Sequence, residues 1–148
     1  MAKLHAYLSF ENAKESMEYY REVFGATLLE RMKMDADMAK EWGATTDNLE
    51  DTTIHGGFVV LGNTIFCSDR FGEGEPFSSS VTLMLDFNSE DAEDVAALET
   101  LYKNVTESGV EIIDPLKEQF WGGRMGIIKD KYGLTWMFHA QPYSRLAK

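Results

Sequence analysis

One succession of predicted elements occurs twice in this sequence, and this repeat limits the possible folds more than any other feature. Each copy has a strand, an amphipathic helix, a glycine and then three strands. The first strands of the two copies align at a constant offset, since Phe87 follows Phe10 by 77 positions, as Leu85 follows Leu8. Each helix is expected to cover one face of its own sheet, which leaves the opposite face as the wall of a concave cavity.

The first copy begins with a predicted strand over 4–10 and a helix over 12–24. Asn12 can cap this helix together with Glu15, and Gly25 suits its end. The apolar side chains of the helix recur at positions i, i+4, i+7 and i+11: Ala13, Met17, Tyr20 and Phe24. Further strands are predicted over 26–33, 54–61 and 64–68, with Gly62-Asn63 as a hairpin turn.

The second copy begins with a predicted strand over 81–87 and a helix that Ser89 can cap and Gly109 ends. Three strands follow, over 110–113, 125–129 and 134–140, with an irregular stretch over 115–123, a turn at Tyr132-Gly133 and a loose tail after Pro142. Between the copies, residues 70–78 carry two glycines and a proline and are expected to be a linker. The polar segment 34–52 is expected to be a partly helical excursion. We therefore expect one domain, residues 1–148, with modules at about 1–69 and 79–141.

Composition excludes several classes of protein. With 148 residues, 44% of them apolar, the chain can bury a sizeable core. It has no apolar run near the roughly 20 residues that span a bilayer. Its single cysteine permits no internal disulfide, which favours a reducing compartment, and we expect the cytoplasm. A net charge of −11 disfavours binding to nucleic acid.

Three stretches give the chain its resemblance to the vicinal-oxygen-chelate superfamily, which includes glyoxalases and bleomycin-resistance proteins. Within it, the chain resembles the PhnB-like proteins, which also carry the name 3-demethylubiquinone methyltransferase. The stretches are Tyr7-Leu8-Ser9-Phe10 with 13–26, His55-Gly56-Gly57 with 61–69, and 130–136. The resemblance implies an α+β fold of paired βαβββ modules, a homodimer, and a small-molecule ligand in the concave sheets.

Many enzymes of the superfamily hold one divalent metal ion on the first and last strand of each half. Carried over by register, the resemblance places that site at His5, Cys67, Thr82 and Met137. A first-row divalent ion needs about three imidazole, carboxylate or thiolate ligands. Only His5 and Cys67 qualify, so we expect no metal cofactor. A divalent ion bound through His5 remains the alternative.

The residues predicted to contact a ligand share strand register or loop position around the expected cavity: His5, Tyr7, His55, Cys67, Thr82, Trp121, Met137 and His139. His5 and His139 can hold a metal ion, act as a general base, or hydrogen-bond to their surroundings. Two interpretations are open for Cys67, a reactive thiol and a core residue. Two are open for Asp86 as well, a buried carboxylate and an exposed residue at the end of a strand.

Aromatic residues also occur in predicted loops, at Trp42, Phe71, Phe77, Phe120 and Trp121. Such residues suit a planar ligand, but they also suit a dimer interface or a cover over the core. Trp136 has the opposite strand parity to Met137 and is expected in the core.

Three functions fit these features: a metal-free small-molecule binder, a divalent-metal enzyme of glyoxalase, dioxygenase or thiol-transferase type with an atypical ligand set, and a non-metal enzyme that uses His5 or Cys67. The ligand positions favour the binder, and we assign no catalytic residue. Methyl transfer is not expected, because no glycine-rich nucleotide-binding turn is present.

Overall fold

The computed structural model describes residues 1–44 and 48–146 and divides into two compact units, Met1–Gly74 and Glu75–Lys148. The boundary falls inside 70–78, the stretch expected to be a linker. Each unit is described by itself. None of the helices in the described ranges is long and apolar enough to cross a membrane.

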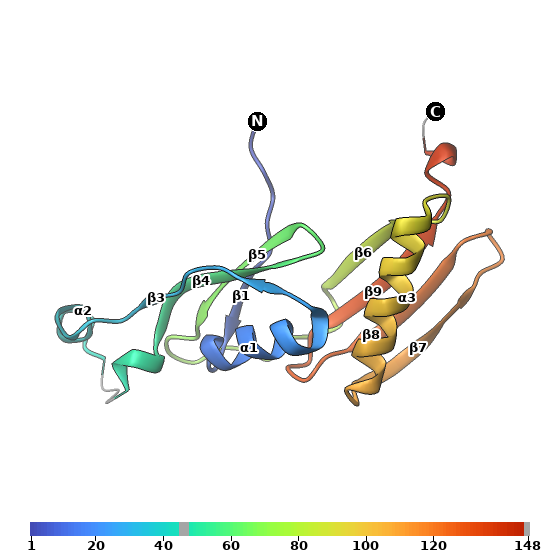
Figure 1. The fold of residues 1–148 in the computed structure, drawn as a ribbon. Coiled ribbons are helices and arrows are strands. Elements are labelled where there is room, and N and C mark those ends of the chain that lie inside the picture. The colour runs from blue at the N-terminus through green and yellow to red at the C-terminus, as the bar shows by residue number, and fades with distance from the viewer. Residues whose placement is uncertain (45–47, 147–148) are drawn as a thin grey trace. The chain divides into compact units, whose positions relative to one another are not determined.

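The N-terminal unit is a mixed sheet with one long helix against it (Figure 1). The strand order is β1-β5-β4-β2, β3 also pairs with β4, and only β1 and β5 run parallel. The elements of this unit are β1 (Tyr7–Phe10), α1 (Ala13–Phe24), β2 (Thr27–Leu28), β3 (Met32–Lys33), α2 (Ala36–Glu41), the 3-10 turn η1 (Leu49–Asp51), β4 (Thr53–Val60) and β5 (Asn63–Asp69).

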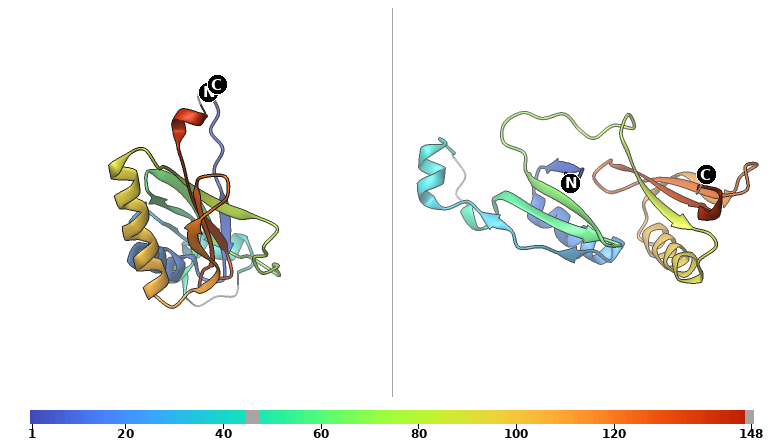
Figure 2. Two further views of the ribbon diagram at one scale, coloured as in Figure 1. Left: turned by 90° about the vertical axis from the view of Figure 1, so that its right-hand side faces the viewer. Right: turned by 90° about the horizontal axis from the view of Figure 1, so that it is seen from above.

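The C-terminal unit repeats this plan with a longer first strand and a longer helix. Its strand order is β6-β9-β8-β7, and again the first strand, β6, pairs in parallel with the last, β9. Figure 2 shows α3 against one face of this sheet. The repeat and the α+β fold expected from the sequence are thus confirmed. The elements are β6 (Thr82–Asn88), α3 (Ala92–Glu107), β7 (Glu111–Glu118), β8 (Arg124–Lys129), β9 (Thr135–Gln141) and the 3-10 turn η2 (Tyr143–Arg145).

The residues that cap α1 are those predicted from the sequence, but the residue that caps the start of α3 is not. Asn12 accepts the Glu15 N–H at the start of α1, and Gly25 takes φ +66° after its end, as predicted. In α3 the N-cap is Asp91, not Ser89, because the Asp91 carboxylate accepts the N–H groups of Glu93 and Asp94. All four residues of the predicted apolar stripe of α1 are buried.

The helices α1 and α3 each pack on the sheet of their own unit through an aromatic pair. In the N-terminal unit Tyr20 stacks on Phe58 with centroids 4.7 Å apart and planes at 9°. In the C-terminal unit Tyr102 meets Phe138 edge-on at 5.3 Å. Trp136 has the strand parity of Phe138 and is 1% exposed, so its expected place in the core is confirmed.

Three predicted boundaries in the N-terminal unit are wrong. The first strand, expected over 4–10, begins at Tyr7, so His5 precedes it. The expected strand over 26–33 is two short strands, because the pairing with β4 stops after Leu28 and resumes, irregularly, at Met32. The turn between β4 and β5 is at Leu61-Gly62, one position before the predicted Gly62-Asn63. Both residues take positive φ, +48° and +79°, as a type I′ hairpin turn requires. The excursion over 34–52 is partly helical, as expected, and residues 45–47 within it lie outside the described ranges.

Two more differences lie in the C-terminal unit. Residues 115–118 of the stretch expected to be irregular continue β7, which runs to Glu118 with shifts of register, and 119–123 form the loop to β8. Pro115 is tolerated there because β7 is an edge strand. The tail after Pro142 was expected to be loose, but as far as Leu146 it is held against the unit. The Ser144 N–H and hydroxyl both donate to the Glu90 carboxylate at 2.8 Å.

Candidate functional site

The open face of the C-terminal sheet, opposite α3, carries the richest set of functional groups. Phe138 contacts α3, so the residues of opposite parity in β9 point away from the helix. Met137 and His139 have this parity, together with their register partners on the two neighbouring strands: Met84 and Asp86 on β6, and Ile127 and Met125 on β8. Thr82 has the same parity as Met84, at the start of β6.

An imidazole–carboxylate pair lies on this face. Nδ1 of His139 is 2.7 Å from Oδ1 of Asp86, and the two side chains are 15% and 28% exposed. Gln141 also donates to the Asp86 carboxylate, at 3.3 and 3.4 Å, and the Tyr143 hydroxyl donates to the Asp86 carbonyl at 2.9 Å. Burial, with the Asp86 carboxylate adding to the effect, raises the pKa of Tyr143, so its hydroxyl stays a donor.

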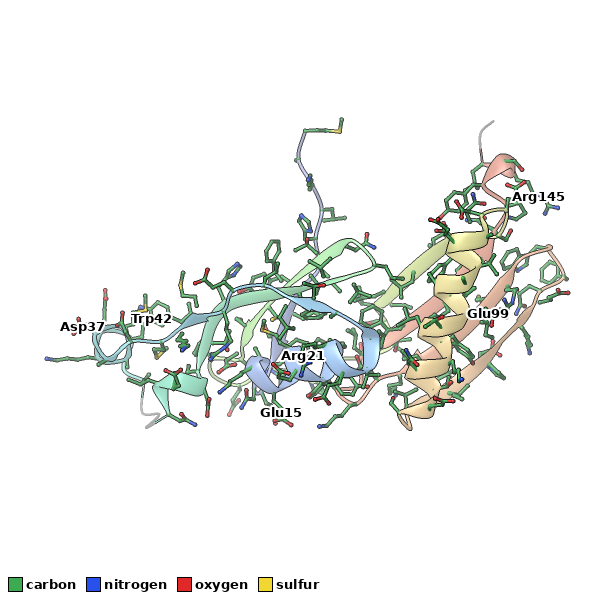
Figure 3. All side chains as sticks on the ribbon, viewed as in Figure 1. Glu15, Arg21, Asp37, Trp42, Glu99 and Arg145 are labelled. Carbon is green, nitrogen blue, oxygen red and sulfur yellow. The ribbon has the colours of Figure 1, made fainter. Side chains whose placement is uncertain are left out.

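Trp121 covers the imidazole from the loop between β7 and β8. Its ring stacks on that of His139, with centroids 5.0 Å apart and planes at 23°. Arg145, labelled on η2 in Figure 3, donates to the Trp121 carbonyl at 3.3 Å. The loop closes through Gly122, which takes φ +88°, and through Gly123, where a side chain would overlap the Trp121 ring. These contacts hold the indole against the imidazole.

A second aromatic group lies on the corresponding face of the N-terminal sheet. Phe66 contacts both His55, at a centroid distance of 5.4 Å, and His5, at 5.2 Å. The Tyr7 hydroxyl lies 3.4 Å from His55 Nδ1, and His5 Nδ1 donates to the Thr64 carbonyl at 3.0 Å. The structure thus brings together three of the predicted residues, His5, Tyr7 and His55, around an unpredicted one, Phe66.

Cys67 lies on the other face of that sheet. Its register partner Gly56 faces α1, because a side chain at Gly56 would meet the Met17 sulfur at 3.2 Å. Cys67 is fully buried on this covered face, and burial raises the pKa of its thiol to about 12. The placement corrects its expected position among the residues that line the open face, since a shift of one residue along a strand reverses the face.

The donor set does not fit the metal ion that the superfamily resemblance implies. A thiol with a pKa near 12 is a poor source of the thiolate that a metal binds, and neither a neutral threonine hydroxyl nor a thioether is one of the imidazole, carboxylate or thiolate ligands that a first-row divalent ion needs. Within the part of the chain that the structure describes, no three His, Cys, Asp or Glu side chains gather in a way that could hold a metal.

The loop aromatics divide between two roles. Trp121 belongs to the open face of the C-terminal unit, whereas Trp42 and Phe71 contact each other, at 6.2 Å, in the N-terminal unit. Phe120 is fully exposed. Sequence reasoning missed the pairing of Asp86 with His139 and the role of Phe66. Strand register was the signal for both: it becomes usable for Asp86 once β6 is known to be parallel to β9, and for Phe66 once β5 is known to pair with β1 and β4.

Comparison with known proteins places the chain in a family. A sequence model described as 3-demethylubiquinone-9 3-methyltransferase matches residues 2–138. The chain belongs to this family. Among curated proteins, Protein YjdN of Escherichia coli (strain K12) is 29% identical over 144 residues, which cover 92% of this chain and 93% of that protein.

Solved structures show the same fold. A PhnB protein from Bacillus cereus, titled a putative 3-demethylubiquinone-9 3-methyltransferase, is 22% identical with a TM-score of 0.69, over 95% of this chain and all of that one. The fosfomycin resistance protein FosX from Listeria monocytogenes is 14% identical with a TM-score of 0.61, over 97% and 96% of the two chains. A glyoxylase/bleomycin resistance protein/dioxygenase domain from Frankia sp. EAN1pec is 16% identical with a TM-score of 0.65, over 95% and 97%. The family found in the sequence is therefore confirmed by the matching sequence model, and the glyoxalase/bleomycin-resistance fold by the solved structures.

Proposed function

We propose that this protein binds a small, planar, largely apolar molecule on the open face of its C-terminal sheet, without a metal ion. One observation carries the proposal: the Trp121 ring stacks on His139, on a sheet face that also carries Met125 and Met137 by register. An aromatic ring on a face with polarisable methionines favours flat ligands, and a ligand that meets a preformed site loses less free energy to ordering. The His139–Asp86 pair supplies the polar group that orients the ligand.

A thermal-shift screen tests the proposal. Protein treated with a chelator is heated with members of a metabolite library, with and without divalent metal ions, and binding raises the melting temperature with ligand concentration. We expect planar compounds to raise it without added metal. Trp121→Leu should lower the affinity for a compound found in the screen by about three- to tenfold, the contribution of one aromatic contact. Calorimetry measures this affinity. Phe120→Leu is the matched control, because the neighbouring ring is fully exposed. Equal binding by both variants contradicts the proposal.

The competing function is a divalent-metal enzyme. A related FosX structure is described as a complex with Mn(II) and 1S,2S-dihydroxypropylphosphonic acid. We propose that this chain does not share that property, because its register positions do not supply three suitable ligands. Elemental analysis of the purified protein should find less than one equivalent of tightly bound metal. Stoichiometric metal that is lost in His5→Ala overturns this part of the proposal.

Methyl transfer is not proposed, although the family description names it. Enzymes that bind a nucleotide-containing cofactor at a strand-to-helix turn use glycines to bring the backbone close to it. Here β1 leads into α1 through Glu11-Asn12, and β6 leads into α3 through Ser89-Glu90-Asp91. Neither turn contains a glycine.

We also propose that two copies associate. The superfamily resemblance implies a homodimer, and exposed apolar residues such as Ile112 and Ile113 on the edge strand β7 support it. Light scattering coupled to gel filtration should report twice the chain mass. We propose the cytoplasm as the location, on the ground that the single cysteine is free.

A further inference from the structure

We propose that His139, positioned by Asp86, acts as a metal-free general base on an acidic C–H or O–H group of a planar aromatic ligand. This inference rests on the proposed function, since it assumes that the ligand lies on the same open face. It adds a reaction class to that site. The observations that carry it are the Nδ1–Oδ1 hydrogen bond, the contacts that hold Asp86, and the ring of Trp121.

The hydrogen bond determines which nitrogen of His139 accepts a proton. An ionised carboxylate only accepts hydrogen bonds, so Nδ1, 2.7 Å from Asp86 Oδ1, carries the hydrogen. In the neutral imidazole the lone pair is then on Nε2. The structure gives Nε2 no protein partner among the described residues, so it can accept a proton from a ligand.

Asp86 is a positioning residue in this arrangement. Its carboxylate also accepts from Gln141, and its carbonyl accepts from Tyr143, so both its side chain and its backbone are held. The carboxylate keeps the imidazole in one tautomer and stabilises the imidazolium that forms when a proton arrives. By register, the charged residues Asp114 and Lys117 of β7 lie on the same face and pair with each other, and the Arg145 guanidinium of η2 donates to the Trp121 carbonyl.

The reaction is a proton transfer and needs no other reactant. The ligand's C–H or O–H bond breaks, its proton goes to Nε2 of His139, and the electron pair stays on the ligand. A planar conjugated ligand can delocalise that pair, which is why this ligand class suits the site. The proton then returns to another position of the ligand or passes to water. Nothing is oxidised or reduced.

The ring opening of 5-nitrobenzisoxazole tests the base directly. A base removes the C3 proton, the C–H electrons form the nitrile, and the N–O bond breaks to release 2-cyano-4-nitrophenolate, a coloured product. We expect chelator-treated protein to accelerate the reaction, and His139→Gln to lower kcat by about tenfold or more while KM changes by less than about threefold. His139→Asn serves as a second variant if His139→Gln unfolds. Added imidazole should partly restore the rate of either.

The positioning role of Asp86 is tested by measuring which ring nitrogen of His139 carries the hydrogen. In wild-type protein, the ¹⁵N chemical shifts of His139 should report the hydrogen on Nδ1. Asp86→Asn should change the tautomer mixture and lower kcat, and Asp86→Glu should restore part of both. Glu99→Gln is the matched control, because Glu99 is a carboxylate of α3, on the other side of the sheet, that pairs with Arg124.

Binding of the unreactive planar analogue 5-nitroindazole separates this inference from the proposed function. If the analogue binds and Trp121→Leu weakens it, but His139→Gln leaves kcat unchanged, the general base is overturned and the binding function stands. If the analogue does not bind and the ligand screen finds no planar compound, both are overturned.

Discussion

The ring of Trp121 occupies the space where a side chain of Gly123 would lie. A Cβ atom built on Gly123 would come within 1.8 Å of the indole and within 2.5 Å of the Ala140 carbonyl oxygen. The stacking of Trp121 on His139 therefore depends on a glycine two residues further along the chain.

Gly123→Ala should displace the indole from the imidazole. Because the methyl group meets both a ring and a backbone carbonyl, we expect the free energy of unfolding to fall by about 1–3 kcal/mol. The loss of stacking should appear as a change in tryptophan fluorescence and in the His139 ring proton shifts. Gly74→Ala is the control, since its methyl group would meet only the flexible side chain of Arg70. An unchanged His139 spectrum in Gly123→Ala contradicts this account of the loop.

Asp130→Asn should strongly destabilise the C-terminal unit. The carboxylate is 5% exposed and accepts the Tyr132 and Leu134 N–H groups at 2.9 and 3.0 Å and the Trp136 indole N–H at 2.9 Å. An amide replaces one accepting oxygen with a donor that faces other donors, so we expect a loss of about 2–4 kcal/mol. Denaturant unfolding measures it. Asp114→Asn, at an exposed carboxylate, should cost less than about 0.5 kcal/mol, and a similar effect of both variants would show that the buried hydrogen bonds add nothing.

Cys67 should be unreactive in the folded protein. Its pKa is raised to about 12, first by burial and then by the Asp69 carboxylate, so the nucleophilic thiolate is scarce at neutral pH. Labelling with Ellman's reagent at pH 8 should be about a hundredfold slower than in guanidinium. The unfolded thiol ionises near pH 9 and the folded one near 12, so stability should fall as pH rises through this window. Rapid labelling of native protein would place Cys67 on an accessible face.

Ser144→Ala should raise the pKa of Glu90. In the wild type the N–H and hydroxyl of Ser144 both donate to this carboxylate and hold its pKa below its ordinary value of 4.5. A lowered folded-state pKa means that the stability it contributes is present above 4.5 and is lost as pH falls through the folded value. Carboxyl-detected NMR titration gives the shift. Ser78→Ala, which removes the Ser78–Ser80 hydrogen bond of an exposed segment, should leave the pKa of Glu90 unchanged.

The sequence by itself determined the elements whose causes are local. Asn12 and Gly25 delimit α1, the spacing from Ala13 to Phe24 selects its buried face, and the repeated element order predicts two sheets of similar plan. These features depend on residues a few positions apart, so period and capping chemistry suffice. The family also followed from the sequence, because its motifs extend over both halves of the chain.

Only the tertiary structure decided what depends on pairing between distant strands. The turn at Leu61-Gly62 instead of Gly62-Asn63 was settled by the register of β4 against β5, and Cys67 faces α1 because of the same register. Likewise, Asp86 and His139 are 53 residues apart and meet because β6 runs parallel to β9. Side chains alternate between the faces of a strand, so an uncertainty of one residue in register decides between core and open face, and no local pattern removes it.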